Sequence, residues 1–187
     1  MSENTQQART VATADHGTLD LKALTLYAIL LAAGFVLNMT VSKFFSGLTG
    51  GFLSPEFIIA AFCLEILIIK PKVPQAAALG LLAGVVIQIT ASVKGLDLIA
   101  EPVPAVVMAL LVNAFAKGEP AKAFPLVSTF VVTCISGLTY AAIFSFFVMQ
   151  NPAFLGVMAP VVAGTGVANA IVVAALYIPI KKALKIA

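Results

Sequence analysis

Two glutamates stand at the edges of long apolar segments, where a carboxylate can do chemistry that the surrounding side chains cannot. Glu56 follows the sequence GGFLSP at residues 50–55, and Glu101 precedes the apolar run of residues 102–116. A charge held away from water is costly unless it is paired, so a carboxylate at such a position favours a cationic ligand group. We therefore take Glu56 and Glu101 as candidate partners for a cation.

Further polar and aromatic residues are expected near these glutamates. Lys43, Gln88 and the backbone amides of residues 50 and 51 can donate hydrogen bonds to an anion, while Phe52, with Phe44 and Phe45, can stack on a flat ring. Asn169 lies deep in another apolar run and needs an internal partner, which is either a neighbouring helix or a ligand. The candidate substrate-binding residues are Glu56, Glu101, Lys43, Gln88, Phe52 and Asn169.

The sequence contains none of the residue patterns of a common catalytic site. There is no Walker phosphate loop, no His or Cys cluster with the spacing of metal ligands, and no nucleophile beside a histidine. Cys63 and Cys134 both fall in apolar runs and are expected to act as small buried hydrophobic residues. We expect no catalytic residue, no metal and no cofactor, so that any use of ATP belongs to another protein.

Composition places these residues in a membrane protein. Hydrophobic residues make up 61% of the chain and charged residues only 10%, against about 25% charged residues in a typical soluble domain. The basic residues are scattered singly or in pairs between apolar runs, which argues against a nucleic-acid partner. We therefore expect an integral membrane protein whose surroundings are a lipid bilayer.

The apolar runs predict an all-α bundle of six transmembrane helices. Residues 1–20 are expected to form a disordered tail, and residues 21–187 the substrate-binding domain. The first helix is predicted over residues 23–42, followed by a flexible loop at 44–51. The remaining helices are predicted from near residue 52 to 69, over 73–93, over 102–116, and on either side of the turn at 150–152.

Charge predicts the orientation of this bundle. Six spans put both termini on one side, which then carries nine of the 11 Lys and Arg residues, against Lys43 and Lys94 on the other. The positive-inside rule makes the termini cytoplasmic. Glu56, Gln88 and Glu101 then lie in the outer half of the membrane, where they either line a pocket that opens outward or simply mark the outer interface.

The first predicted helix carries a face of small residues. Ala28 and Ala32 are four residues apart and therefore lie on one side of a helix. Small side chains allow a second helix to approach closely within a bilayer, where helix association depends on close packing. The alternative is that alanine is simply common in membrane helices.

Several short stretches resemble the substrate-binding S components of energy-coupling factor transporters. The size, the six expected spans, the cytoplasmic termini and the Ala28-x-x-x-Ala32 spacing are similar to that family. The chain is most similar to the predicted tryptophan-transport S components, through GGFLSPE at 50–56, EPVPA at 101–105 and NAIVVAALYIPI at 169–180. One departure is Glu56, which stands where we expect Asp in that family.

The resemblance implies an uptake protein that is not an enzyme and that lies in the plasma membrane of a prokaryote. It implies that the ligand binds from outside, and that a transmembrane T protein and two cytoplasmic ATPases drive uptake. Ala28 and Ala32 would contact the T protein. The chain contains no tryptophan, which fits a protein made by a cell starved of that amino acid. The alternatives are an S component for a vitamin or other heteroaromatic compound, a single-component secondary carrier, and a non-transporting scaffold.

Overall fold

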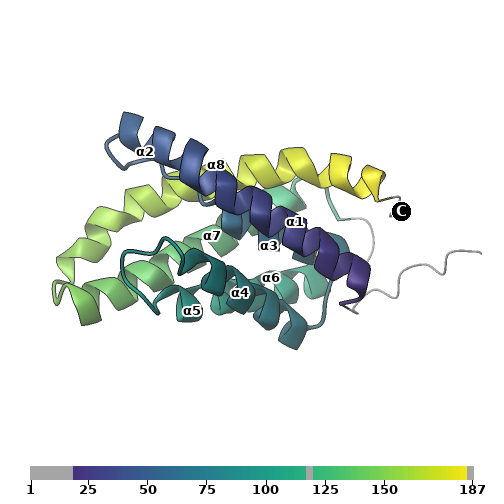
Figure 1. The fold of residues 1–187 in the computed structure, drawn as a ribbon, viewed down its shortest axis with the longest axis horizontal. Helices are drawn as coiled ribbons and strands as arrows, with labels where there is room; N and C mark the ends of the chain where they lie inside the picture. Colours follow the sequence, from purple (N-terminus) through teal and green to yellow (C-terminus); the bar gives the residue numbers. More distant parts are fainter. Residues whose placement is uncertain (1–18, 117–119, 185–187) are drawn as a thin grey trace, which may run out of the picture.

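A computed structural model describes residues 19–116 and 120–184, and every regular element within them is a helix (Figure 1). The predicted all-α class is therefore confirmed for these residues. The elements in chain order are α1 (Leu21–Leu37), the π-helical turn η1 (Asn38–Ser42), α2 (Lys43–Leu48), α3 (Phe57–Ile69), α4 (Val73–Ile87), α5 (Asp97–Ala100), α6 (Pro102–Phe115), α7 (Phe124–Ile143), the π-helical turn η2 (Phe144–Val148) and α8 (Ala153–Ala183).

Within the described residues, four helical segments are long and apolar enough to cross a membrane. They are Leu21–Leu48, Asp97–Phe115, Phe124–Val148 and Ala153–Ala183. α3 and α4 have 13 and 15 residues, whereas about 20 residues are needed to span the hydrocarbon core of a bilayer. The structure thus has the character of a multi-pass membrane protein, and the six-span count stays a prediction.

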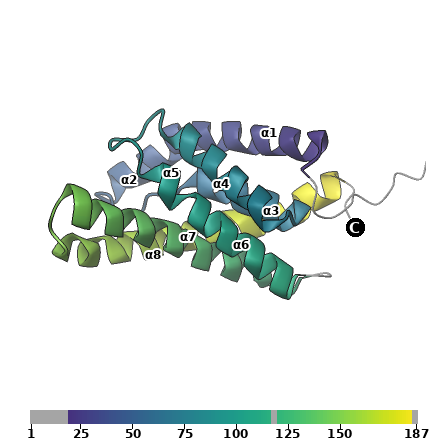
Figure 2. The same ribbon diagram turned by 90° about the horizontal axis from the view of Figure 1, so that it is seen from below.

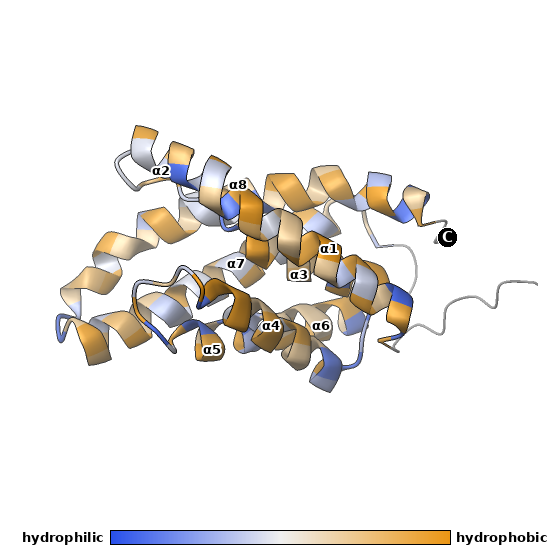
Figure 3. Ribbon diagram, viewed as in Figure 1, coloured by the Kyte–Doolittle hydropathy of each residue, from blue (hydrophilic) through white to orange (hydrophobic). Residues whose placement is uncertain are grey.

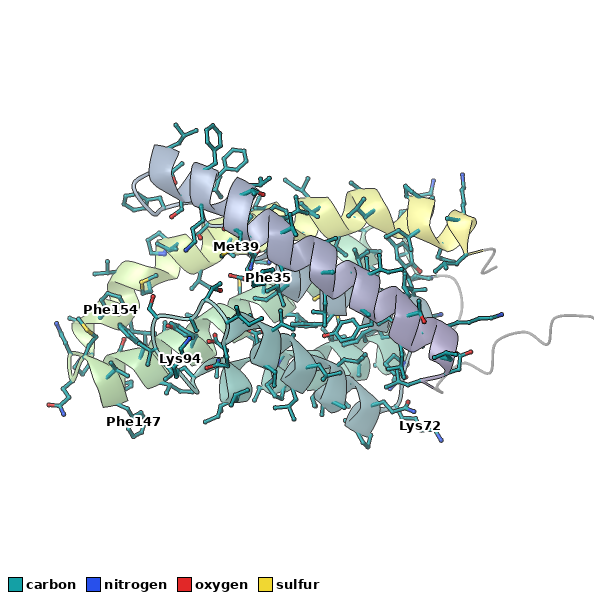
Figure 4. The ribbon with its side chains drawn as sticks, in the orientation of Figure 1. Phe35, Met39, Lys72, Lys94, Phe147 and Phe154 are labelled. Carbon is teal, nitrogen blue, oxygen red and sulfur yellow. The ribbon has the colours of Figure 1, made fainter. Side chains whose placement is uncertain are left out.

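The long helices run back and forth along one axis. The start of α1 and the end of α8 lie at the same end of the bundle, which we call the terminal end (Figures 1 and 2). The opposite end, which we call the loop end, holds α2, α5 and the turn between η2 and α8. Lys72 lies toward the terminal end and Lys94 toward the loop end (Figure 4). The side of the membrane that each end faces remains a prediction.

α3 is the central helix of the bundle. Twelve of its 13 residues are buried, and it packs against α1, α4, α6, α7 and α8. A helix that is hydrophobic all round is expected in the interior, and the sequence FIIAAFCLEILII has that character apart from Glu65. α3 therefore holds Glu65 inside the bundle and Glu56, the residue before its first turn, at the edge of the core.

Two helix boundaries differ from the predictions. The first helix does not end at residue 42, because it continues through the π-helical turn into α2 and ends at Leu48. The break comes at Gly50 and Gly51, whose φ angles of 61° and 90° are ones that side-chain-bearing residues rarely adopt. The predicted loop is therefore displaced toward residues 49–56. α3 in turn begins at Phe57 rather than near Phe52, since Pro55 disfavours a helical conformation at the residue before it.

The other boundaries follow the sequence more closely. The third predicted helix ends early, at Ile87, and the fourth is confirmed over Pro102–Phe115, with α5 lengthening it at its start. The predicted turn between the last two helices is confirmed, and Gln150 in it has a φ of 50°. Of the predicted tail, residues 1–18 lie outside the described residues. Asp20 caps α1 by accepting a hydrogen bond from the Ala23 amide at 2.8 Å.

Apolar side chains cover much of the outer surface of the bundle. Figure 3 shows hydrophobic residues along most of each long helix and hydrophilic residues gathered toward the helix ends. On α1, Tyr27 and Leu31 face the core, while Ala28 and Ala32 are exposed. The predicted small-residue face is thus directed away from the bundle. Of the two cysteines, Cys63 is buried and Cys134 is partly buried, and both are free thiols.

Candidate substrate-binding site

Glu56 is held at the start of α3 by two asparagines from other helices. The Asn38 side-chain amide donates to a carboxylate oxygen of Glu56, and the Asn38 carbonyl oxygen accepts from the Phe57 amide at 2.7 Å. The Glu56 amide donates to the Asn169 side-chain oxygen at 3.0 Å. Both first amides of the helix, which have no partner within α3, are thereby satisfied. Asn38 thus caps α3 from η1 and orients the Glu56 carboxylate.

Asn169 finds its internal partners on two other elements. Its side chain is 0% exposed in α8. Besides accepting from Glu56, its amide nitrogen lies 3.4 Å from the Thr133 hydroxyl oxygen in α7. These contacts connect α8 to the start of α3 and to α7, so the amide has a structural partner on each side. Asn169 therefore positions Glu56, and its own polar atoms are already engaged.

Glu101 lies between α5 and α6 and keeps one oxygen unpaired. The residue is 4% exposed. One carboxylate oxygen accepts a hydrogen bond from the Ser136 hydroxyl in α7 at 3.0 Å, and the other has no hydrogen-bond partner among the described residues. Buried polar atoms in folded proteins nearly always have a partner. The second oxygen of Glu101 is therefore available to a hydrogen-bond donor that the described residues do not supply.

The three acids at the loop end lie close enough for their charges to interact. Asp97 and Glu56 both act on Glu101, and Asp97 also acts on Glu56. Lys43 is the cation whose field reaches Glu56, and its side chain is exposed. Like charges gathered in a partly dry site repel one another unless a cation joins them. A cationic group placed near these acids would therefore reduce the repulsion between them.

Glycines allow the backbones that carry these acids to approach neighbouring helices. A side chain at Gly80 of α4 would lie 2.6 Å from the carbonyl oxygen of Glu101, and one at Gly84 would lie 2.5 Å from that of Asp97. A side chain at Gly34 of α1 would lie 2.8 Å from the carbonyl oxygen of Phe57. These separations are shorter than any ordinary contact of a methyl group. The three glycines therefore set the positions of the segments that carry the acids.

The remaining candidates, Gln88, Lys43 and Phe52, lie around the cluster of Glu56, Asp97 and Glu101 and make no hydrogen bond to either glutamate among the described residues. Gln88 donates to the Asp97 carboxylate at 3.2 Å and accepts from the Gly95 amide at 2.7 Å, so it closes the loop after α4. Lys43 is the first residue of α2. Phe52 is 65% exposed in the loop before α3. Of the six candidates, Glu56 contacts Asn169 and its charge acts on Glu101, Gln88 joins through Asp97, and Phe52 is largely exposed.

No family model, no curated protein and no solved structure matches this chain. The chemistry of the site is therefore inferred from its own side chains. Among the described residues, no group of three His, Cys, Asp or Glu side chains is arranged to hold a metal ion. The groups available to a ligand are the carboxyl groups of Glu56 and Glu101, one oxygen of Glu101 that has no partner among the described residues, and the exposed Lys43.

Several residues of the cluster were not among the predicted candidates. Asn38, Thr133 and Ser136 make the hydrogen bonds that hold Glu56, Asn169 and Glu101, and the sequence marks them only as polar residues within apolar helices. Gly80 and Gly84 carry a clearer signal. Glycines four residues apart in an apolar helix are typical of close helix contacts in membranes, and this spacing would have indicated where α4 meets Glu101 and Asp97.

Proposed function

We propose that this chain is the substrate-binding membrane subunit, or S component, of an energy-coupling factor uptake transporter, and that its substrate is tryptophan taken up from outside the cell. The observation that carries the proposal is the second carboxylate oxygen of Glu101, which is buried and has no partner among the described residues, with Glu56 near enough for its charge to act on Glu101. A primary ammonium has three donors and matches such a pair of carboxyl groups.

An amino acid also requires a partner for its carboxylate and a surface for its side chain. The Lys43 ammonium is the nearest candidate for the carboxylate, because its field reaches Glu56 from an exposed position. The loop of residues 49–56 carries Phe52, and its backbone lies over α8 at Gly164. In the proposed complex this loop moves inward and Phe52 covers the indole ring. The same arrangement suits a vitamin or another heteroaromatic compound that bears a cationic group.

The proposed mode of action assigns energy coupling to other proteins. The transmembrane T protein would contact the exposed Ala28 and Ala32 on α1. Two cytoplasmic ATPases would supply the free energy of ATP hydrolysis for uptake. The apolar outer surface of α1 supports this assignment, because the rest of the bundle covers only a small part of the Leu21–Leu48 segment. A large uncovered apolar face suits either lipid or a partner helix.

A single-component secondary carrier is the second candidate, and a specific observation favours it. Glu65, Asp97 and Glu101 are all buried in the bundle, and buried acids in membrane proteins commonly serve proton-coupled transport. Liposomes that contain only the purified chain distinguish the two functions. An S component binds labelled tryptophan without accumulating it, and accumulates it only when the T protein and the ATPases are present with ATP. Accumulation by the chain alone under a proton gradient would overturn the S-component assignment.

A further inference from the structure

A second buried carboxyl group lies in α3, away from the candidate site. Glu65 is 0% exposed, and neither of its carboxylate oxygens has a hydrogen-bond partner among the described residues. It follows Glu56 by nine residues, which corresponds to about 13 Å along a helix and about half a turn around it. Glu65 therefore faces a different part of the core and belongs to no contact described above.

The surroundings of Glu65 are almost entirely apolar. Its neighbours Leu64 and Ile66 in α3 belong to the hydrophobic core. α4, α6 and η1 pack against α3 and contain no ionisable residue. α1, α7 and α8 also pack against α3 and do carry ionisable groups. These are Asp20, Lys22 and Tyr27 at and in α1, Cys134 and Tyr140 in α7, and Tyr177, Lys181 and Lys182 in α8. α3 itself contains Cys63 and is followed by Lys70.

Among the described residues, the charge that acts on Glu65 is a negative one. Asp20 is the charged residue whose field reaches Glu65, and it is itself an acid. Lys70 donates to the Ala116 carbonyl oxygen at 2.6 Å, and the Lys181 ammonium lies 6.0 Å from the centre of the Tyr177 ring. A carboxylate ion in apolar surroundings without a partner is strongly unfavourable. The ionised form of Glu65 is therefore strongly disfavoured inside the closed bundle.

A proton is the cation that fits this position. Sodium and divalent metal ions require several oxygen ligands around them, and no cluster of acidic, His or Cys side chains among the described residues provides them. A proton requires only one carboxylate oxygen. We infer that Glu65 is a proton-binding site, whose carboxyl group holds its proton inside the bundle.

Tyr27 is a buried phenol that contacts α4 beside the candidate substrate site. Its hydroxyl donates to the Leu79 carbonyl oxygen at 2.5 Å, and the next residue, Gly80, packs against the backbone of Glu101. The fields of both Glu101 and Glu65 reach the Tyr27 hydroxyl. The charges of the two carboxyl groups thus act on the same phenol. This inference goes beyond the proposed function and holds whatever the substrate is.

Infrared difference spectroscopy tests the inference on the purified full-length chain. The spectrum of the wild type minus that of Glu65→Gln at neutral pH should contain the carbonyl band of a protonated carboxylic acid. Carboxylate bands in the Glu65 difference spectrum would overturn the inference.

A second measurement requires no variant and therefore survives a failure of Glu65→Gln to fold. A hydrophobic carbodiimide adds to carboxylic acids that are protonated in apolar surroundings, and mass spectrometry locates the adduct on the chain. We expect an adduct on Glu65 at neutral pH that diminishes at alkaline pH. Adducts confined to other acids would contradict the inference.

Discussion

The Ser136 hydroxyl in α7 donates a hydrogen bond of 3.0 Å to one carboxylate oxygen of Glu101, at the start of α6. Both residues are buried, and the second oxygen of Glu101 has no partner among the described residues. The bond fixes the carboxyl group in one orientation and leaves one oxygen for a ligand. The orientation of the Glu101 carboxyl group is therefore set by Ser136 of a different helix.

Replacing Ser136 with Ala should destabilise the protein by about 1 to 3 kcal/mol, because a buried carboxyl group then loses its hydrogen-bond donor. Ser145→Ala is the matched control. Ser145 is equally buried but its hydroxyl has no partner among the described residues, so its removal should leave stability unchanged or slightly improved. Thermal unfolding in detergent measures both variants. Equal losses for the two would show that the Ser136 contact contributes nothing specific.

Gly80→Ala and Gly84→Ala should each weaken substrate binding and destabilise the bundle. The added methyl group would lie 2.6 or 2.5 Å from a backbone carbonyl oxygen, so α4 must move away from the segment that carries Asp97 and Glu101. Overpacking of this kind costs about 1 to 3 kcal/mol. Gly156→Ala in α8 is the control, since nothing lies within 4 Å of its added methyl group. If Gly84→Ala behaves like Gly156→Ala, the close contact does not exist.

The sequence predicted the helical class better than it predicted the contacts that hold the candidate residues in place. Glu56, Glu101 and Asn169 could be found because polar residues are conspicuous inside apolar runs. The loop after the first helix was placed too early, because the aromatic residues before Gly50 can continue a helix and only the positive φ angles stop it. The cap that Asn38 gives to α3 depends on a contact across 19 positions of the chain, which no local pattern specifies.

The orientation of the bundle can be tested by labelling single cysteines in a variant that lacks Cys63 and Cys134. Cysteines at Gly47 and Asn151, at the loop end, should react with an impermeant thiol reagent added outside intact cells. Cysteines at Lys72 and Lys122 should react only after the cells are opened. This outcome follows from the excess of basic residues predicted on the cytoplasmic side. The reverse pattern would place the candidate site inside the cell.

Replacing Ala28 or Ala32 with Leu should abolish uptake by the complete transporter without affecting substrate binding to the isolated chain. Both residues are exposed on α1, so a larger side chain would keep a partner helix at a distance without disturbing the core. Uptake and binding are measured on the same preparation. Ala23→Leu is a contrasting variant, because Ala23 is buried and its replacement should destabilise the bundle itself. Uptake that survives Leu at both exposed positions would remove this face from the partner interface.

Binding of tryptophan to the purified chain tests the central claim most directly. The chain contains no tryptophan, so indole emission excited at the red edge of its absorption comes from the ligand alone. On titration the emission should shift to the blue and saturate. Glu56→Gln and Glu101→Gln should each weaken binding by about 10- to 100-fold, because each removes an anion from beside the ammonium, while Asp20→Asn at the terminal end should have no effect. Absence of both a spectral shift and saturable heat on titration with tryptophan would contradict the account.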